Sequence, residues 1–164
     1  LQKLHTMALP EIGTKAPAFK GKDENGNLVK LSDYKGKKLV LYFYPKDDTP
    51  GCTAQACNLR DNYKALQKAG YEVIGISSDS ETKHQKFKQK YDLPFTLIAD
   101  TEKEIHEAYG TWVEKSMYGR KYMGTARVTF IIDEKGKITD VIEKVTTKDH
   151  TSQILPAPVT KKAK

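Results

Sequence analysis

A run of apolar and aromatic residues, ended by a proline and followed by a helical pattern, most constrains the fold of this chain. The run from Leu39 to Tyr44 is typical of a strand buried on both faces of a sheet. Beyond Pro45, apolar residues recur at helical spacing between Ala56 and Leu66, and Gly70 is a suitable helix stop. The pattern predicts a buried strand that leads through a short loop into an amphipathic helix.

The chain has two cysteines, Cys52 and Cys57, and both lie at this junction. Thr49 and Pro50 fit the N-cap and first helical positions, which places Cys52 in the first turn of the helix. The unpaired N–H groups and the positive dipole end of a first turn stabilise an anion, so the position favours the reactive thiolate. We also expect the Thr49 hydroxyl to lie within hydrogen-bond reach of the Cys52 sulfur.

Each cysteine also has a purely structural interpretation. Cys52 falls on the apolar stripe of the helix, where a free cysteine commonly serves as a small buried hydrophobe, and Cys57 fits an inert, partly buried residue equally well. Positions five apart on a helix are roughly 8 to 9 Å apart between Cα atoms, whereas a disulfide needs a separation below about 7 Å. A bridge between Cys52 and Cys57 therefore requires the first turn or two of the helix to unwind.

Two separated segments of the chain carry a family resemblance. The segment from Tyr44 to Asp61 (YPKDDTPGCTAQACNLRD) and the segment from Tyr109 to Asp133 (YGTWVEKSMYGRKYMGTARVTFIID) resemble two signatures of the peroxiredoxins, specifically of the bacterioferritin comigratory protein or peroxiredoxin Q branch. The likeness extends from about Gly13 to Leu155. It implies a thiol peroxidase that reduces hydrogen peroxide and organic hydroperoxides without a cofactor, in antioxidant defence and redox homeostasis.

The same resemblance implies a role for five residues. Cys52 would be the peroxidatic cysteine, which becomes a sulfenic acid, and Cys57 would be the resolving cysteine, which then forms an intramolecular disulfide. Thr49 would hydrogen-bond the thiolate and the peroxide, and Pro45 would shield the pocket from water. Arg127 would supply a positive charge beside the thiolate. Spacing alone does not bring Arg127 to the site, and an arginine at a strand start is ordinarily solvated.

Reduction of the disulfide needs an external dithiol, and the resemblance implies thioredoxin or a similar reductant. It also implies a monomer, with a weak dimer as the alternative. Gln55 stands where many relatives carry glutamate, and we expect it to lie outside the chemistry. A thioredoxin-like disulfide oxidoreductase without peroxide specificity is the alternative function, although such proteins normally present two cysteines separated by two residues.

The whole chain fits an α/β, thioredoxin-like fold with a central mixed β-sheet flanked by helices and an added N-terminal β-hairpin. We expect residues 1–6 to be an extension before a natural start at Met7, 7–155 to form the domain, and 156–164 to form a flexible basic tail. Thr101 and Glu104 suggest a capping box for a short helix that ends at Gly110. The further expected elements are a hairpin at 18–30, strands at 71–77 and 95–99, a helix at 80–91, a hairpin of 128–132 with 138–145, and a final helix.

Composition disfavours several other classes of function. The formal net charge is +7, but four of the positive charges belong to Lys3 and to the lysines of the 156–164 tail, and no basic stripe with aromatic residues suggests nucleic-acid binding. No apolar run suits a membrane span. We expect a cytoplasmic protein, because the sequence shows no secretory signal. In such a reducing compartment a cysteine pair is more often catalytic than structural.

Metal binding is also not indicated, because the histidines have no ligand-like spacing with one another or with the cysteines. They lie on different expected elements, and we expect each to be a surface residue. The four histidines are His5, His84, His106 and His150.

Overall fold

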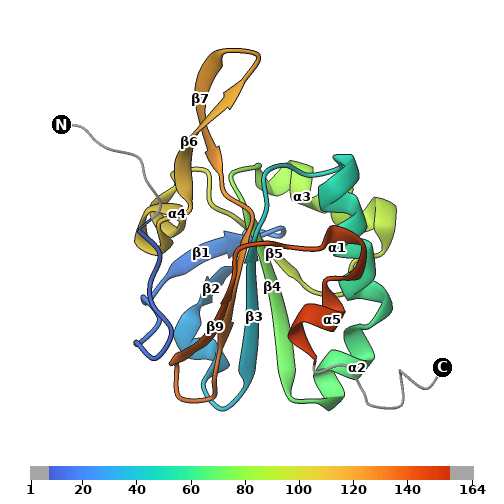
Figure 1. Cartoon of the computed structure of the whole chain (residues 1–164). Helices are drawn as coiled ribbons and strands as arrows, with labels where there is room; N and C mark the ends of the chain where they lie inside the picture. The colour runs from blue at the N-terminus through green and yellow to red at the C-terminus, as the bar shows by residue number, and fades with distance from the viewer. Residues whose placement is uncertain (1–7, 156–164) are drawn as a thin grey trace.

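A seven-stranded mixed sheet, in the order β2-β1-β5-β4-β3-β8-β9, forms the centre of the computed structural model, which describes residues 8–155 (Figure 1). Strand β3 is parallel to β4 and β4 to β5, whereas the other pairs are antiparallel. The strands are β1 Lys20–Asp23, β2 Leu28–Lys30, β3 Lys38–Phe43, β4 Tyr71–Ser77, β5 Thr96–Ala99, β6 Trp112–Met117, β7 Arg120–Thr125, β8 Val128–Ile132 and β9 Ile138–Ile142. The helices are α1 Pro50–Asp61, α2 Tyr63–Lys68, α3 Glu81–Tyr91, α4 Glu104–Tyr109 and α5 Thr151–Ile154, with 3-10 turns η1 Leu31–Tyr34 and η2 Thr147–Asp149.

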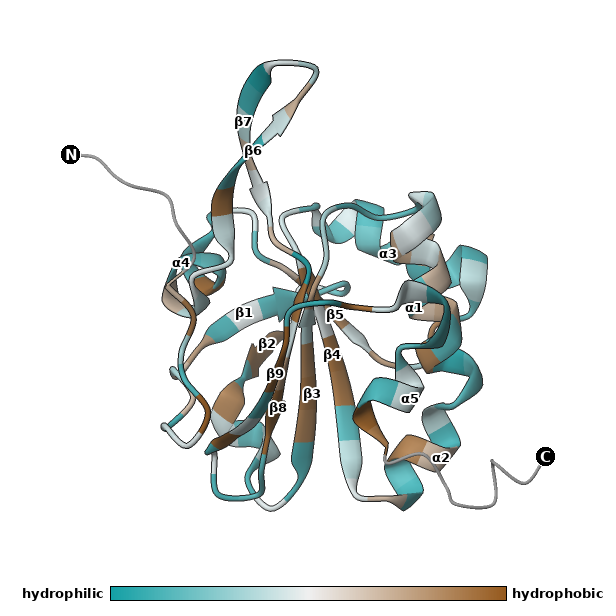
Figure 2. Cartoon of the chain, in the orientation of Figure 1, coloured by the Kyte–Doolittle hydropathy of each residue, from teal (hydrophilic) through white to brown (hydrophobic). Residues whose placement is uncertain are grey.

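The sheet separates two hydrophobic cores, one on each face, and strand β3 contributes side chains to both. Its residues alternate between the faces, because successive side chains of a strand point in opposite directions. Leu39, Leu41 and Phe43 pack on the side that α4 covers. Val40 and Tyr42 pack on the opposite side, together with side chains of α1, α2, α3 and α5. Figure 2 shows the resulting brown, apolar centre of the sheet.

Most of the elements expected from the sequence are present. The structure confirms the buried strand before Pro45, the N-terminal hairpin of β1 and β2, and the β8–β9 hairpin. It also confirms a helix that starts at Pro50 after the N-cap Thr49. The α/β, thioredoxin-like expectation is therefore confirmed in its order of elements.

The helix that carries the cysteines is interrupted, contrary to the expectation of one helix reaching Gly70. It divides at Asn62 into α1 and α2. The Asn62 side chain donates to the Asn58 carbonyl at 2.8 Å, and such local bonds compete with the regular ladder of a helix. The apolar stripe continues across the interruption, since Leu59 and Leu66 belong to the same core.

The cap of the short helix α4 also differs from the expected one. Thr101 does not cap it. The Asp100 carboxylate accepts instead from the N–H groups of Ile105 and His106, at 3.2 and 2.8 Å. The expected stop at Gly110 is present, with a left-handed φ of 69°.

A second sheet, the hairpin of β6 and β7, was not expected. It projects from the body of the molecule (Figure 1). Its residues are mostly polar and its tip exposes Met117 and Tyr118, so the sequence shows little of the alternation that marks a half-buried strand.

The expectation of surface histidines is wrong for all three that the structure describes. His84, His106 and His150 are fully buried. Each has polar partners on both ring nitrogens, which removes the cost of burying an imidazole. His5, the expected extension 1–6 and the expected tail 156–164 lie outside the described residues.

Candidate active site

Cys52 lies in the first turn of α1, behind the loop 45–49 that follows β3. The first helical hydrogen bond runs from the Thr53 N–H to the Thr49 carbonyl at 2.8 Å. The cysteine is 1% exposed and packs with the apolar core under α1. These surroundings are those of a small buried hydrophobic residue, as expected for a structural cysteine. The first turn of α1, with its dipole and its free N–H groups, is also a position that stabilises negative charge.

Arg127 supplies a polar contact that a purely structural cysteine does not need. It immediately precedes β8, and β8 pairs with β3 so that Val128 lies opposite Phe43. This pairing brings Arg127 to the loop that leaves β3. Its Nη2 donates to Sγ of Cys52 at 3.4 Å, and a fixed cation at that distance stabilises negative charge that develops beside it.

Gln55 orients the arginine, contrary to our expectation that it lies outside the chemistry. Its Oε1 accepts from Nη1 of Arg127 at 2.7 Å. Gln55 is fully buried, and its Nε2 has no hydrogen-bond partner among residues 8–155. Because Gln55 follows Cys52 by three residues on a helix, the two side chains share one face. That spacing is the signal in the sequence that we did not use.

Gly51 leaves the space in which the guanidinium lies. A Cβ at this position would lie 3.3 Å from Nη2 of Arg127, which is closer than an ordinary van der Waals contact. The absence of a side chain thus permits the contact between Arg127 and Cys52.

Pro45 begins the loop before α1 and Thr49 ends it, and both are partly buried. The Thr49 hydroxyl donates to the Lys46 carbonyl at 2.8 Å, so the expected hydrogen bond to the Cys52 sulfur is not formed in the described part of the chain. The oxygen of that hydroxyl keeps its acceptor capacity for a hydrogen-bond donor bound beside it.

Cys57 lies further along α1 and is partly buried, and both cysteines are free thiols. The next residue, Asn58, fastens α1 to the C-terminal segment of η2 and α5. Its side chain donates to the Lys148 carbonyl at 3.2 Å and accepts from the Thr151 N–H at 2.8 Å. The second cysteine is thus held on a regular helix that is braced from outside, away from the first one.

Two further titratable groups are influenced by the charges of the site. Burial raises the pKa of Tyr42 well above its usual value, and the charge of Cys52 adds to the rise. Burial lowers the pKa of Lys115 on β6, and the neighbouring Arg127 charge lowers it further. Tyr42 therefore stays protonated, and the charges of Arg127 and Cys52 both act on Lys115 of β6, in opposite directions.

Comparison with known proteins identifies the family. Residues 12–141 match the model of the AhpC/TSA family. The chain is 51% identical over 145 residues to a putative peroxiredoxin bcp of Coxiella burnetii, which covers 88% of this chain and 96% of that protein. It is 49% identical to peroxiredoxin Bcp of Bacillus subtilis, with coverages of 88% and 92%. The chain belongs to the AhpC/TSA family and is a peroxiredoxin. It is an oxidoreductase that reduces peroxides with a thiol reductant.

Solved structures of this family have the same fold as this peroxiredoxin. Peroxiredoxin Q of Xanthomonas campestris aligns with a TM-score of 0.81 at 30% identity, over 92% of this chain and 95% of that one. A structure of the bacterioferritin comigratory protein of the same organism, studied for its alkyl peroxide reduction activity, aligns equally well, over 93% and 96% of the two chains. The comparisons thus confirm the family and the fold expected from the two sequence signatures.

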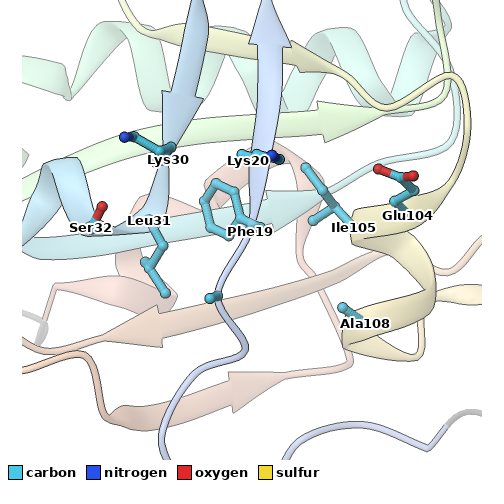
Figure 3. Close-up of a pocket in the computed structure, with 9 residues that line it drawn as sticks. Phe19, Lys20, Lys30, Leu31, Ser32, Glu104, Ile105 and Ala108 are labelled. Atoms are coloured by element: carbon cyan, nitrogen blue, oxygen red, sulfur yellow. The ribbon is translucent and has the colours of Figure 1, made fainter.

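An apolar pocket of about 450 Å³ lies away from the cysteine of this peroxiredoxin. Phe19, Leu31 and Ile105 line it, on the face of the sheet that α4 covers (Figure 3). Cys52 packs on the opposite face, so this pocket does not deliver a substrate to the thiol. Within residues 8–155, no helix is long and apolar enough to cross a membrane.

The contact between Gln55 and Arg127 gives a prediction. In Gln55→Ala, the guanidinium loses the acceptor that holds its Nη1, and we expect the second-order rate constant for peroxide attack to fall about tenfold, because a catalytic donor loses its orientation. Gln55→Glu keeps an acceptor at the same place and should lose much less. Stopped-flow oxidation of the reduced proteins measures both. Gln85→Ala is the control, because it removes a glutamine bond of similar length, 2.8 Å, from α3 to the Glu24 carbonyl and leaves Arg127 untouched. A Gln55→Ala variant as fast as the control would show that Arg127 needs no orienting partner.

Proposed function

We propose that Cys52 is the peroxidatic cysteine of this thiol peroxidase. The observation that carries the proposal is the guanidinium of Arg127 at 3.4 Å from a sulfur in the first turn of a helix. In the proposed step the Cys52 thiolate attacks the terminal oxygen of a hydroperoxide and the O–O bond breaks. The sulfur becomes a sulfenic acid, and the leaving oxygen takes a proton to give water or an alcohol.

The neighbouring residues act on the charge that develops in this step. Arg127 stabilises the thiolate and then the negative charge that spreads onto the two peroxide oxygens. Thr49 offers its hydroxyl oxygen to the hydrogen of the peroxide, and Pro45 shields the thiolate from water. Hydrogen peroxide and organic hydroperoxides are the proposed substrates. The alkyl peroxide reduction for which the Xanthomonas relative was studied supports the second group.

Cys57 completes the cycle as the resolving cysteine. Its thiolate attacks the sulfenic sulfur of Cys52, the S–O bond breaks, the leaving hydroxide takes up a proton to give water, and an intramolecular disulfide forms. The intact helix keeps the two cysteines too far apart for this bond, so α1 must unwind locally first. A dithiol such as thioredoxin then reduces the disulfide by exchange.

We also propose that the protein works as a monomer in the cytoplasm. Both cysteines of the cycle lie on one helix, so neither step requires a second chain. Both are free thiols, which suits a reducing compartment with a supply of reduced thioredoxin.

Titration with peroxide tests the function. Reduced protein mixed with one equivalent of hydrogen peroxide should rapidly lose both thiols, with a mass lower by about two hydrogens, and thioredoxin should restore both. The urea-unfolded protein provides the rate of an ordinary thiol as the control. Oxidation no faster than this control would refute the assignment of Cys52, and a rapid gain of one oxygen with Cys57 still free would refute the assignment of Cys57.

A further inference from the structure

The loop 45–49 before Cys52 is fastened to α3 by a buried histidine. His84 is fully buried on α3, and its Nδ1 lies 2.7 Å from Oδ2 of Asp47. Its Nε2 lies 2.9 Å from the carbonyl oxygen of Ile98 on β5. The other carboxylate oxygen of Asp47 accepts from the Tyr44 hydroxyl at 2.5 Å. Asp47, in the middle of the loop, is thus held by Tyr44, the residue that directly follows β3, and by His84 on α3.

The partners of His84 determine its charge. A backbone carbonyl can only accept a hydrogen bond, and an ionised carboxylate can also only accept. A neutral imidazole has one N–H and satisfies only one of these two acceptors. Both contacts are satisfied together only by the imidazolium, which forms a buried ion pair with Asp47.

Asp47 attaches the loop to the interior in two ways. Its side chain forms the pair with His84, and its N–H donates to Oδ2 of Asp79 at 2.8 Å. Asp48 has a left-handed φ of 58° and binds Lys90 and Tyr91, but this second attachment is exposed to solvent. Pro45 and Thr49 flank Asp47 at a distance of two residues. Within residues 8–155, the only side-chain bond that either forms is the exposed one from Thr49 to the Lys46 carbonyl.

We propose that His84, as an imidazolium, is a positioning residue for the peroxide site, because it fixes Asp47 and with it the loop that places Pro45 and Thr49 at the entrance to Cys52. This inference rests on the proposed function of Cys52. His84 touches neither the sulfur nor the substrate, and it acts through the loop.

The pH dependence of this attachment has a definite sign. Burial lowers the pKa of His84, but the hydrogen bond and charge of Asp47, the Ile98 carbonyl and the charge of Asp79 outweigh it, so that the pKa is raised. The pair therefore contributes fully at pH values below about 6.5, the pKa of an unfolded histidine, and is lost as the pH rises through the higher folded-state value. The other titratable groups around the pair are Tyr44, which directly follows β3 and stays protonated, and Lys83 on α3, which lies 4.0 Å from Asp79.

The test compares the second-order rate constant for oxidation of Cys52 by hydrogen peroxide in the wild type and in His84→Gln. Glutamine keeps hydrogen-bonding groups but not the charge, and we expect a rate about tenfold lower at pH 6, in keeping with the sensitivity of catalysis to small displacements. The ratio of the two rates should move towards one as the pH rises. The midpoint of that change should match the pH at which nuclear magnetic resonance shows loss of a ring proton from His84.

Two further variants separate positioning from folding. His106→Gln removes a second buried pair, between His106 and Asp100, on the face of the sheet covered by α4, and should destabilise the protein without slowing the oxidation. Asp47→Asn leaves His84 in place and removes the charge of its partner. If His84→Gln does not fold, the oxidation rate of Asp47→Asn tests the same contact. Because the two residues act through one contact, the double variant should be no slower than the slower single variant.

Different outcomes refute different statements. A slow wild type would refute the peroxidatic role of Cys52, whatever the variants do. A fast wild type, with folded His84→Gln and Asp47→Asn variants that are equally fast, would overturn the role of His84. Rate losses that multiply in the double variant would also overturn it, since the two residues would then act independently.

Discussion

Replacement of Cys52 by serine is expected to abolish peroxide reduction, with a loss of at least about a thousandfold in the rate of peroxide consumption. A serine hydroxyl is not ionised at neutral pH, and neither Arg127 nor the helix dipole can make it a nucleophile of comparable strength. The measurement is thioredoxin-coupled peroxide consumption, with thermal unfolding to show that the variant is folded.

Cys57→Ser is the matched comparison for this variant. It should undergo one oxidation per molecule at the wild-type rate, because the Cys52 site is intact, and should then lose thioredoxin-supported turnover. Mass spectrometry should find one added oxygen in place of a disulfide. Equal loss of the first oxidation in both variants would contradict the division of roles between the two cysteines.

Arg127→Ala is expected to slow peroxide attack by about 10² to 10³, the usual effect of removing one donor that stabilises a developing negative charge. The effect should appear in the second-order rate constant of Cys52 oxidation. The disulfide should still form from a sulfenic acid already present, because Cys57 supplies the attacking sulfur, and its rate should not fall, since the variant removes two of the bonds that hold the start of α1.

Arg127→Lys tests the geometry of the same contact. A lysine keeps the positive charge, but its single ammonium group cannot reproduce the planar fork that bonds Gln55 and the sulfur together. We expect an intermediate rate. A lysine variant as fast as the wild type would mean that charge alone matters, and an alanine variant as fast would remove Arg127 from the mechanism.

The sequence alone predicts the position of one of these residues, Cys52, but not the contact that Arg127 makes with it. The position of Cys52 was predictable, because strand pattern, proline, N-cap and first turn are local signals that the 39–52 segment carries itself. The contact of Arg127 was implied only by the family resemblance. It requires β8 to pair with β3, and no local pattern at Arg127 encodes that pairing.

The errors have physical causes of the same kind. His84 was expected at the surface because histidine on a polar helix is usually exposed, and its partner Asp47 comes from a different element that only the folded chain brings near. Gln55 was set aside for a similar reason, since its role exists only when Arg127 is present. The β6–β7 hairpin was missed because a projecting hairpin buries little and so carries little hydrophobic alternation.

The brace that Asn58 forms with η2 and α5 has a consequence for the time course of the reaction. A helix that unwinds through Cys57 also moves Asn58 and must release its bonds to Lys148 and Thr151. In the proposed cycle, the sulfenic acid on Cys52 cannot react with Cys57 until these bonds have broken. During this interval a second peroxide molecule competes with Cys57, and its product is an inactive sulfinic acid. We therefore expect a weaker hold of the C-terminal segment on α1 to raise the peroxide concentration at which the enzyme is inactivated.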